Sequence, residues 1–73
     1  MPKFSIMDRS GHSEQVFDKA DVVSVKEAEK RFAELTGAGF TAAKVTGPGT
    51  QELIRAFDPN VEETIFHPQL QGG

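Results

Sequence analysis

The residues whose chemistry stands out are the last five, Gln69-Leu70-Gln71-Gly72-Gly73. Glycine has no Cβ, so a backbone ending in two glycines can enter a narrow channel and adopt whatever φ the channel requires. A terminal carboxylate at Gly73 would become an acyl donor once an enzyme had activated it, for example as an acyl-adenylate. Leu70 would anchor the segment in an apolar groove, as extended peptides are held through alternate side chains. These residues predict a conjugation tail; the alternative is that two glycines stand here by chance.

The two histidines are the other residues with site chemistry. His12 lies in a segment of turn composition, and His67 directly precedes Pro68. A metal site would need further carboxylate or thiolate ligands at helical or hairpin spacing, and the chain has no cysteine. No oxyanion hole or orienting carboxylate is evident for a serine–histidine pair. We therefore predict no metal site, no cofactor and no enzymatic activity.

Length and charge limit the classes of protein further. The chain has 73 residues, of which 37% are hydrophobic, so one small domain is all that it can bury. Its net charge of −3 argues against non-specific binding to nucleic acid, because that affinity comes from clustered cations. No apolar run approaches the roughly 18–20 residues that span a bilayer, and no signal segment opens the chain. We expect a cytoplasmic monomer with neither nucleic-acid nor membrane partners.

The clearest predicted element is an amphipathic helix over about residues 25–36. Ser24 and Glu27 have the spacing of a capping box, in which a hydroxyl and a carboxylate each satisfy a free backbone N–H. Gly37 is expected to end the helix in a left-handed conformation. Apolar residues recur at helical spacing and form one stripe: Val25, Ala28, Phe32 and Leu35.

Five segments have the alternation or composition of strands, over residues 3–8, 14–18, 40–45, 52–57 and 63–67. The order ββαβββ predicts an α+β fold in which the helix packs on one face of a mixed four- to five-stranded sheet. We assign residues 1–68 to this domain and residues 69–73 to a flexible C-terminal tail.

The element order and the ending Gln69-Leu70-Gln71-Gly72-Gly73 together resemble the ubiquitin-like β-grasp group. That group includes the small sulfur carriers of molybdopterin and thiamin synthesis and the bacterial ubiquitin-like proteins. Gln71 stands where ubiquitin has a basic residue. The resemblance implies a protein modifier whose terminal glycine carboxylate is adenylated by a separate activating enzyme, for transfer to a target amine or to sulfur. It implies that enzyme, and a processing peptidase, as partners.

The fourth and fifth predicted strands carry more apolar residues than one helix-covered sheet face requires. We predict that the surplus, Ile54, Ala56 and Phe66, forms an exposed partner-binding patch. The alternative is that the helix and the Pro68 region, or strong curvature of the sheet, bury both faces. An exposed patch favours a competing hypothesis, in which the chain is a small non-enzymatic adaptor or assembly module with an inert tail. A regulatory subunit of an enzyme is a third hypothesis that the sequence does not separate from the adaptor.

Overall fold

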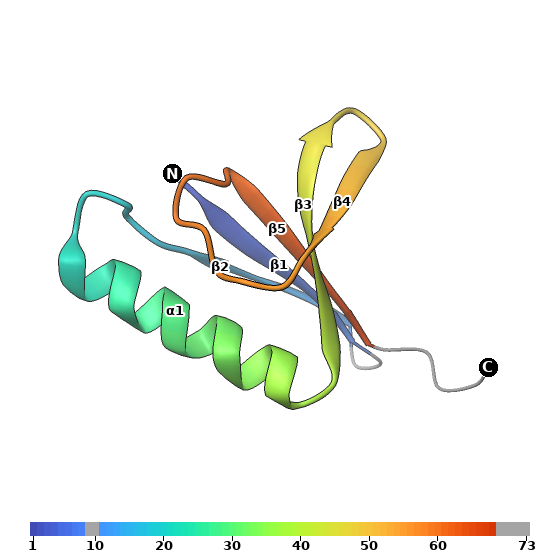
Figure 1. Cartoon of the computed structure of the whole chain (residues 1–73), viewed down its shortest axis with the longest axis horizontal. Helices are drawn as coiled ribbons and strands as arrows, with labels where there is room; N and C mark the ends of the chain where they lie inside the picture. Colours follow the sequence, from blue (N-terminus) through green and yellow to red (C-terminus); the bar gives the residue numbers. More distant parts are fainter. Residues whose placement is uncertain (9–10, 69–73) are drawn as a thin grey trace.

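The computed structural model describes residues 1–8 and 11–68. Its elements run in the order ββαβββ, so the predicted α+β fold, with one helix on a mixed sheet, is confirmed (Figure 1). This arrangement is consistent with a β-grasp-like fold. The elements are β1 (Lys3–Asp8), β2 (Gly11–Val16), α1 (Val22–Gly37), β3 (Phe40–Gly47), β4 (Thr50–Ile54) and β5 (Glu63–Pro68).

The last strand of the chain lies in the middle of the sheet. The five strands are ordered β2-β1-β5-β3-β4, so β2 and β4 form the two edges. β1 and β5 are parallel, whereas the other three neighbouring pairs are antiparallel. α1 crosses one face of this sheet (Figure 1). The chain therefore leaves β5 at Pro68 from the central strand and not from an edge.

Tight connections set the strand boundaries. In the first hairpin Asp8 pairs with Gly11, so β2 begins three residues earlier than predicted and ends at Val16. In the second hairpin Gly47 pairs with Thr50 around Pro48 and Gly49. Gly49 has φ of 74°, the conformation that the third position of a type II turn requires. The pairing that begins at this turn ends at Ile54, so the predicted strand 52–57 is displaced toward the turn.

The helix begins three residues before the predicted start, because its cap is a different residue. The Asp21 carboxylate accepts hydrogen bonds from the backbone N–H groups of Val23 (3.0 Å) and Ser24 (3.4 Å). The Ser24 hydroxyl instead accepts from the backbone N–H of Asp18 at 2.9 Å. The predicted capping box is therefore wrong, and Asp21 is the N-cap.

The end of the helix also differs from the prediction. Gly37 is the last helical residue, and Ala38 is the C-cap. The Ala38 N–H donates to the carbonyl of Glu34 at 3.0 Å. The left-handed conformation falls at Gly39, where φ is 101°. The reversal from α1 into β3 thus takes place two residues later than the predicted Gly37 cap.

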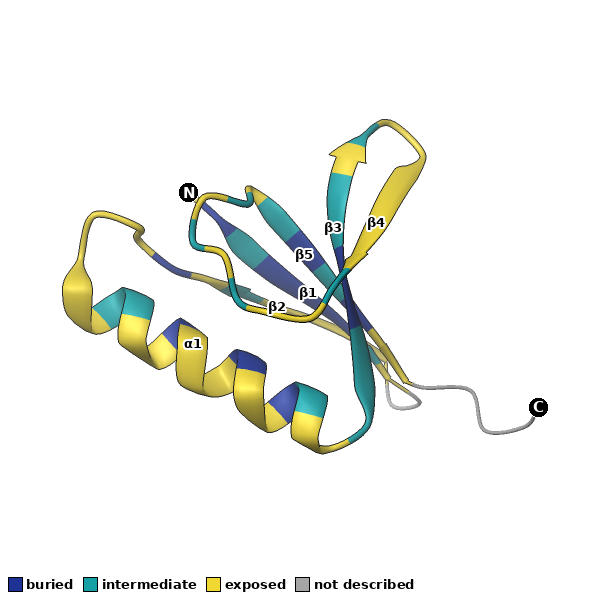
Figure 2. Cartoon of the chain, in the orientation of Figure 1, coloured by how far each residue is buried: buried dark blue, intermediate teal, exposed yellow. Residues whose placement is uncertain are grey.

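The buried residues lie where α1 and the sheet face each other (Figure 2). Aromatic rings dominate this core. The helix buries Ala28, Phe32 and Leu35, three of the four residues of its predicted stripe. Phe4, from β1, is the centre of the aromatic packing, and its exposed fraction is 1%. Its ring centroid lies 5.0–6.5 Å from four others, in tilted or edge-on geometry: Phe17, Phe32, Phe57 and Phe66.

Candidate functional site

The candidate site lies on the sheet face that points away from α1, which we call the open face. Successive strand residues point to opposite faces, so Phe4 and Ile6 face the helix while Lys3, Ser5 and Met7 face away from it. The strand pairings extend this division across the sheet. Ser5 pairs with Glu14 of β2 and with Ile65 of β5, which places both on the open face.

The predicted partner-binding patch of Ile54, Ala56 and Phe66 is wrong. Phe66 has an exposed fraction of 0% and belongs to the core, and Ile54 packs against that core. Both pair with Ala42, a buried residue on the helix-facing side. Ala56 is exposed, but it follows the end of β4 and lies outside the sheet. The structure therefore does not bring the three residues together as an exposed surface.

An apolar row does occur on the open face. In β4 and β5 it consists of the residues that directly precede the predicted ones. Ala43 pairs with Ile65 of β5 and with Leu53 of β4. Leu53 is 70% exposed, Ile65 is half-buried and Ala43 is buried between them. We call Leu53, Ala43 and Ile65 the open-face patch. The alternation of the fourth strand contained this signal, but without the register nothing indicated which of Leu53 and Ile54 pointed outward.

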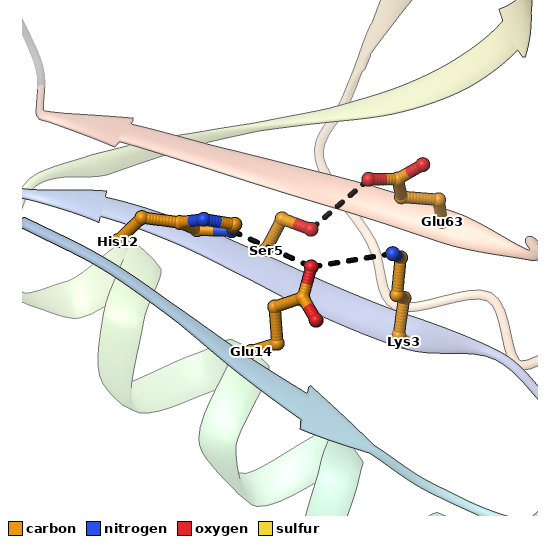
Figure 3. Close-up of polar contacts among 5 residues, drawn as sticks. All are labelled: Lys3, Ser5, His12, Glu14 and Glu63. Carbon is orange, nitrogen blue, oxygen red and sulfur yellow. Dashed lines mark hydrogen bonds and ion pairs between the residues drawn. The ribbon is translucent and has the colours of Figure 1, made fainter.

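Charged side chains occupy the other half of the open face, over β1 and β2. Lys3 Nζ donates to Glu14 Oε2 at 3.2 Å, and His12 Nε2 lies 3.6 Å from the same oxygen (Figure 3). These side chains are 37–48% exposed, so each pair contributes about 0–1 kcal/mol to stability. The Ser5 hydroxyl donates to Glu63 Oε2 at 3.0 Å, which satisfies a side chain that is only 1% exposed.

The geometry gives no enclosed reaction site within the described part of the chain. Over residues 1–8 and 11–68 the structure contains no pocket. In the same ranges no three side chains of the His, Cys, Asp and Glu types lie together in a way that could hold a metal ion. His12 and His67 are both exposed on strands. The chemistry available to the described residues is therefore that of an open surface.

The predicted conjugation tail, Leu70, Gln71, Gly72 and Gly73, lies outside the described residues. What the structure places is its point of attachment. β5 ends at Pro68, which is exposed together with His67. The tail therefore stays a prediction. Its point of attachment is the exposed end of the central strand.

Comparisons of the chain with protein families, with curated proteins and with solved structures found no match. Within the described ranges, no helix combines the length and the apolar character that a membrane crossing requires.

Proposed function

We propose that the chain is a ubiquitin-like protein modifier and that Gly73 carries the carboxylate that is activated. The observation that supports this proposal is the position of Pro68 at the end of β5. Pro68 is exposed and ends the central strand, and only four residues separate it from the final glycine. A compact body followed by a short Gly-Gly segment is what a tail-activating enzyme requires. The body itself contributes recognition and no chemistry.

The length of the segment fits that role. At roughly 3.3–3.6 Å per residue, a fully extended chain from Pro68 to Gly73 would reach about 20 Å. An enzyme can therefore draw the carboxylate to a bound nucleotide while the sheet and helix stay outside its site. Leu70 would contact an apolar groove on the way, and Gly72 and Gly73 would pass its narrowest part because they have no side chain.

The reaction would occur in two steps. A carboxylate oxygen of Gly73 attacks the α-phosphorus of ATP, and pyrophosphate leaves. The carbonyl carbon of the resulting acyl-adenylate is then attacked by an amine, a thiol or sulfide, and AMP leaves. The first attacking group would give an isopeptide bond, the second a thioester and the third a thiocarboxylate. The two uses of the tail, conjugation and sulfur transfer, share the first step and diverge at the second.

The test is to incubate the protein with ATP and adenylating enzymes from its own organism, and to measure the intact mass. We expect an adenylate or thioester adduct and release of pyrophosphate. Deletion of Gly72 and Gly73 should abolish both, whereas Leu53→Ala, which leaves the tail intact, should retain both. Failure with all such enzymes would contradict the proposal. So would a native protein that continues past Gly73 and is never cleaved there.

The open-face patch favours a second candidate, the non-enzymatic adaptor. Leu53 is 70% exposed beside Ala43 and Ile65, and exposed apolar patches mark partner sites. In that case removal of residues 69–73 would leave partner binding unchanged, whereas Leu53→Ala would weaken it. The two candidates therefore predict opposite outcomes for the same pair of variants.

A further inference from the structure

The two histidines of the chain lie on the two strands that flank Met7 of β1. His12 of β2 pairs directly with Met7 of β1. On the other side of β1, the parallel pairing with β5 includes Ile6 and Phe66, and Met7 and His67 are the next residues along the two strands. If the register of β1 and β5 continues by one residue, the three residues occupy successive positions across three adjacent strands, and we call them the His-Met-His row.

The row lies on the open face. Ser5 and Ile65 pair there, and Met7 and His67 each follow by two residues, so alternation returns them to the same face. Met7 is half-buried, and the two histidines that flank it are exposed. Adjacent strands lie about 4.7–4.9 Å apart, so His12 and His67 stand roughly 10 Å apart at their backbones, with Met7 between them. Two imidazoles at that separation can converge above the intervening thioether.

We propose that the His-Met-His row binds a single Cu(I) ion through two imidazole nitrogens and the Met7 sulfur. Thioether sulfur is a soft ligand that favours Cu(I), and imidazole binds copper well. Zn(II) sites in contrast use four ligands of the Cys, His, Asp and Glu types, and the described residues hold no group of three of these. The ligand set thus discriminates in favour of the softer ion with the lower coordination number.

A carboxylate is already in place beside one of the ligands. Glu14 Oε2 lies 3.6 Å from His12 Nε2 and is held at 3.2 Å by Lys3 Nζ (Figure 3). Metal-bound histidines commonly direct their other ring nitrogen at a carboxylate, which fixes the ring and makes it a better ligand. With Nε2 directed at Glu14, the nitrogen of His12 that remains for the metal is Nδ1. Glu14 is therefore a positioning residue and not a ligand.

This inference is independent of the proposed tail chemistry, because every residue that it uses lies in the described sheet. The decisive measurement is titration of the full chain with Cu(I), under anaerobic reducing conditions, against a competing colorimetric Cu(I) chelator. We expect one ion per chain. Glu14→Gln should weaken binding by about tenfold, the lower end of the loss that removal of an outer-shell partner causes, and His12→Gln, His67→Gln and Met7→Leu should each cost more, about 100-fold, because each removes a ligand.

Leu53→Ala is the matched control, because it alters the same face outside the row and should bind Cu(I) like the wild type. Zn(II) should bind far more weakly than Cu(I). The proposal is overturned if Met7→Leu binds like Leu53→Ala, if His67→Gln has no effect, or if Zn(II) binds as tightly as Cu(I).

A second measurement needs no variant and so does not depend on how the variants fold. In NMR spectra of the wild-type chain, one equivalent of Cu(I) should shift the Met7 methyl signal together with the ring signals of both histidines. A shift confined to His12 would reduce the site to an exposed imidazole and would overturn the proposal. X-ray absorption of the same sample should show a sulfur neighbour of copper; its absence would have the same consequence.

Discussion

The two faces of the sheet are built from the same strands, yet they differ in almost every property. The helix-facing side carries large rings, with Phe4 and Phe66 almost completely buried. The open face carries the small Ala43, the hydroxyl of Ser5 and charged or imidazole side chains. Two large apolar residues project from it, one on each edge strand: Leu53 of β4, which is 70% exposed, and Val16 of β2, which is 55% exposed.

The difference shows where stability and recognition are located in a domain of this size. Burial of apolar area is the main stabilising term, and nearly all of it lies on the helix side. The open face contributes little to folding stability. Its side chains can therefore be chosen for binding a partner at little cost in stability. Because strand residues alternate with period two, a shift of one residue in pairing would exchange the faces completely. Register is thus what separates core from candidate site.

The largest expected effect comes from removing the central ring of the covered face. Phe4→Ala should lower the free energy of unfolding by about 3–5 kcal/mol, because it removes a ring that packs against four others. Chemical denaturation measures this directly. In a domain this small, such a loss would leave much of the population unfolded.

The control for Phe4→Ala is Val16→Ala on the edge strand β2. Val16 pairs with Lys3, which lies on the open face, and it is 55% exposed. Its truncation should change the free energy of unfolding by about 0.5 kcal/mol or less, the usual range for surface substitutions. Comparable losses for the two variants would mean that the covered face does not dominate stability.

A sharper comparison uses two adjacent residues of β4 that point in opposite directions. Ile54→Ala should cost about 1–2 kcal/mol, less than a fully buried isoleucine, because Ile54 is half-buried against the core. Leu53→Ala should cost only a few tenths of a kcal/mol, since the Leu53 side chain is mostly exposed and lies outside the core. Thermal unfolding of both variants measures the difference. A reversed order would show that the register of β3 and β4 is shifted by one residue.

Much of this architecture was predictable from local patterns. The ββαβββ order followed from alternation in the strands and from the 3.6-residue stripe of the helix, and three of the four stripe residues are buried. The turn at Asp58 also has a local signal, because Asp and Pro are favoured in the first two positions of a type I turn. The Asp58 carbonyl accepts from Val61 N–H at 3.2 Å, and its side chain accepts from Asn60 N–H at 2.9 Å. Such signals are local because they depend on residues within a few positions of one another.

The candidate site was not predictable, because its residues meet only through pairing between distant strands. The patch was assigned to Phe66, which the register places in the core opposite Ala42. The two histidines looked unrelated, and only the sheet order β2-β1-β5 places them on the two strands that flank Met7. Composition and spacing contain neither the strand order nor the direction in which a mixed apolar strand points. Those depend on the energy of the whole sheet.

The smallest of the expected effects concerns the cap that sets where the covering helix begins. Asp21→Ala should lower the free energy of unfolding by about 1 kcal/mol, because the N–H groups of Val23 and Ser24 lose their acceptor. Asp21→Asn is the matched control: its amide oxygen accepts the same bonds, and the loss should be a few tenths of a kcal/mol. Urea denaturation measures the difference in unfolding free energy between the two variants. If Ser24→Ala cost more than Asp21→Ala, the cap would lie at Ser24, and the first turn of the helix over the sheet would not form.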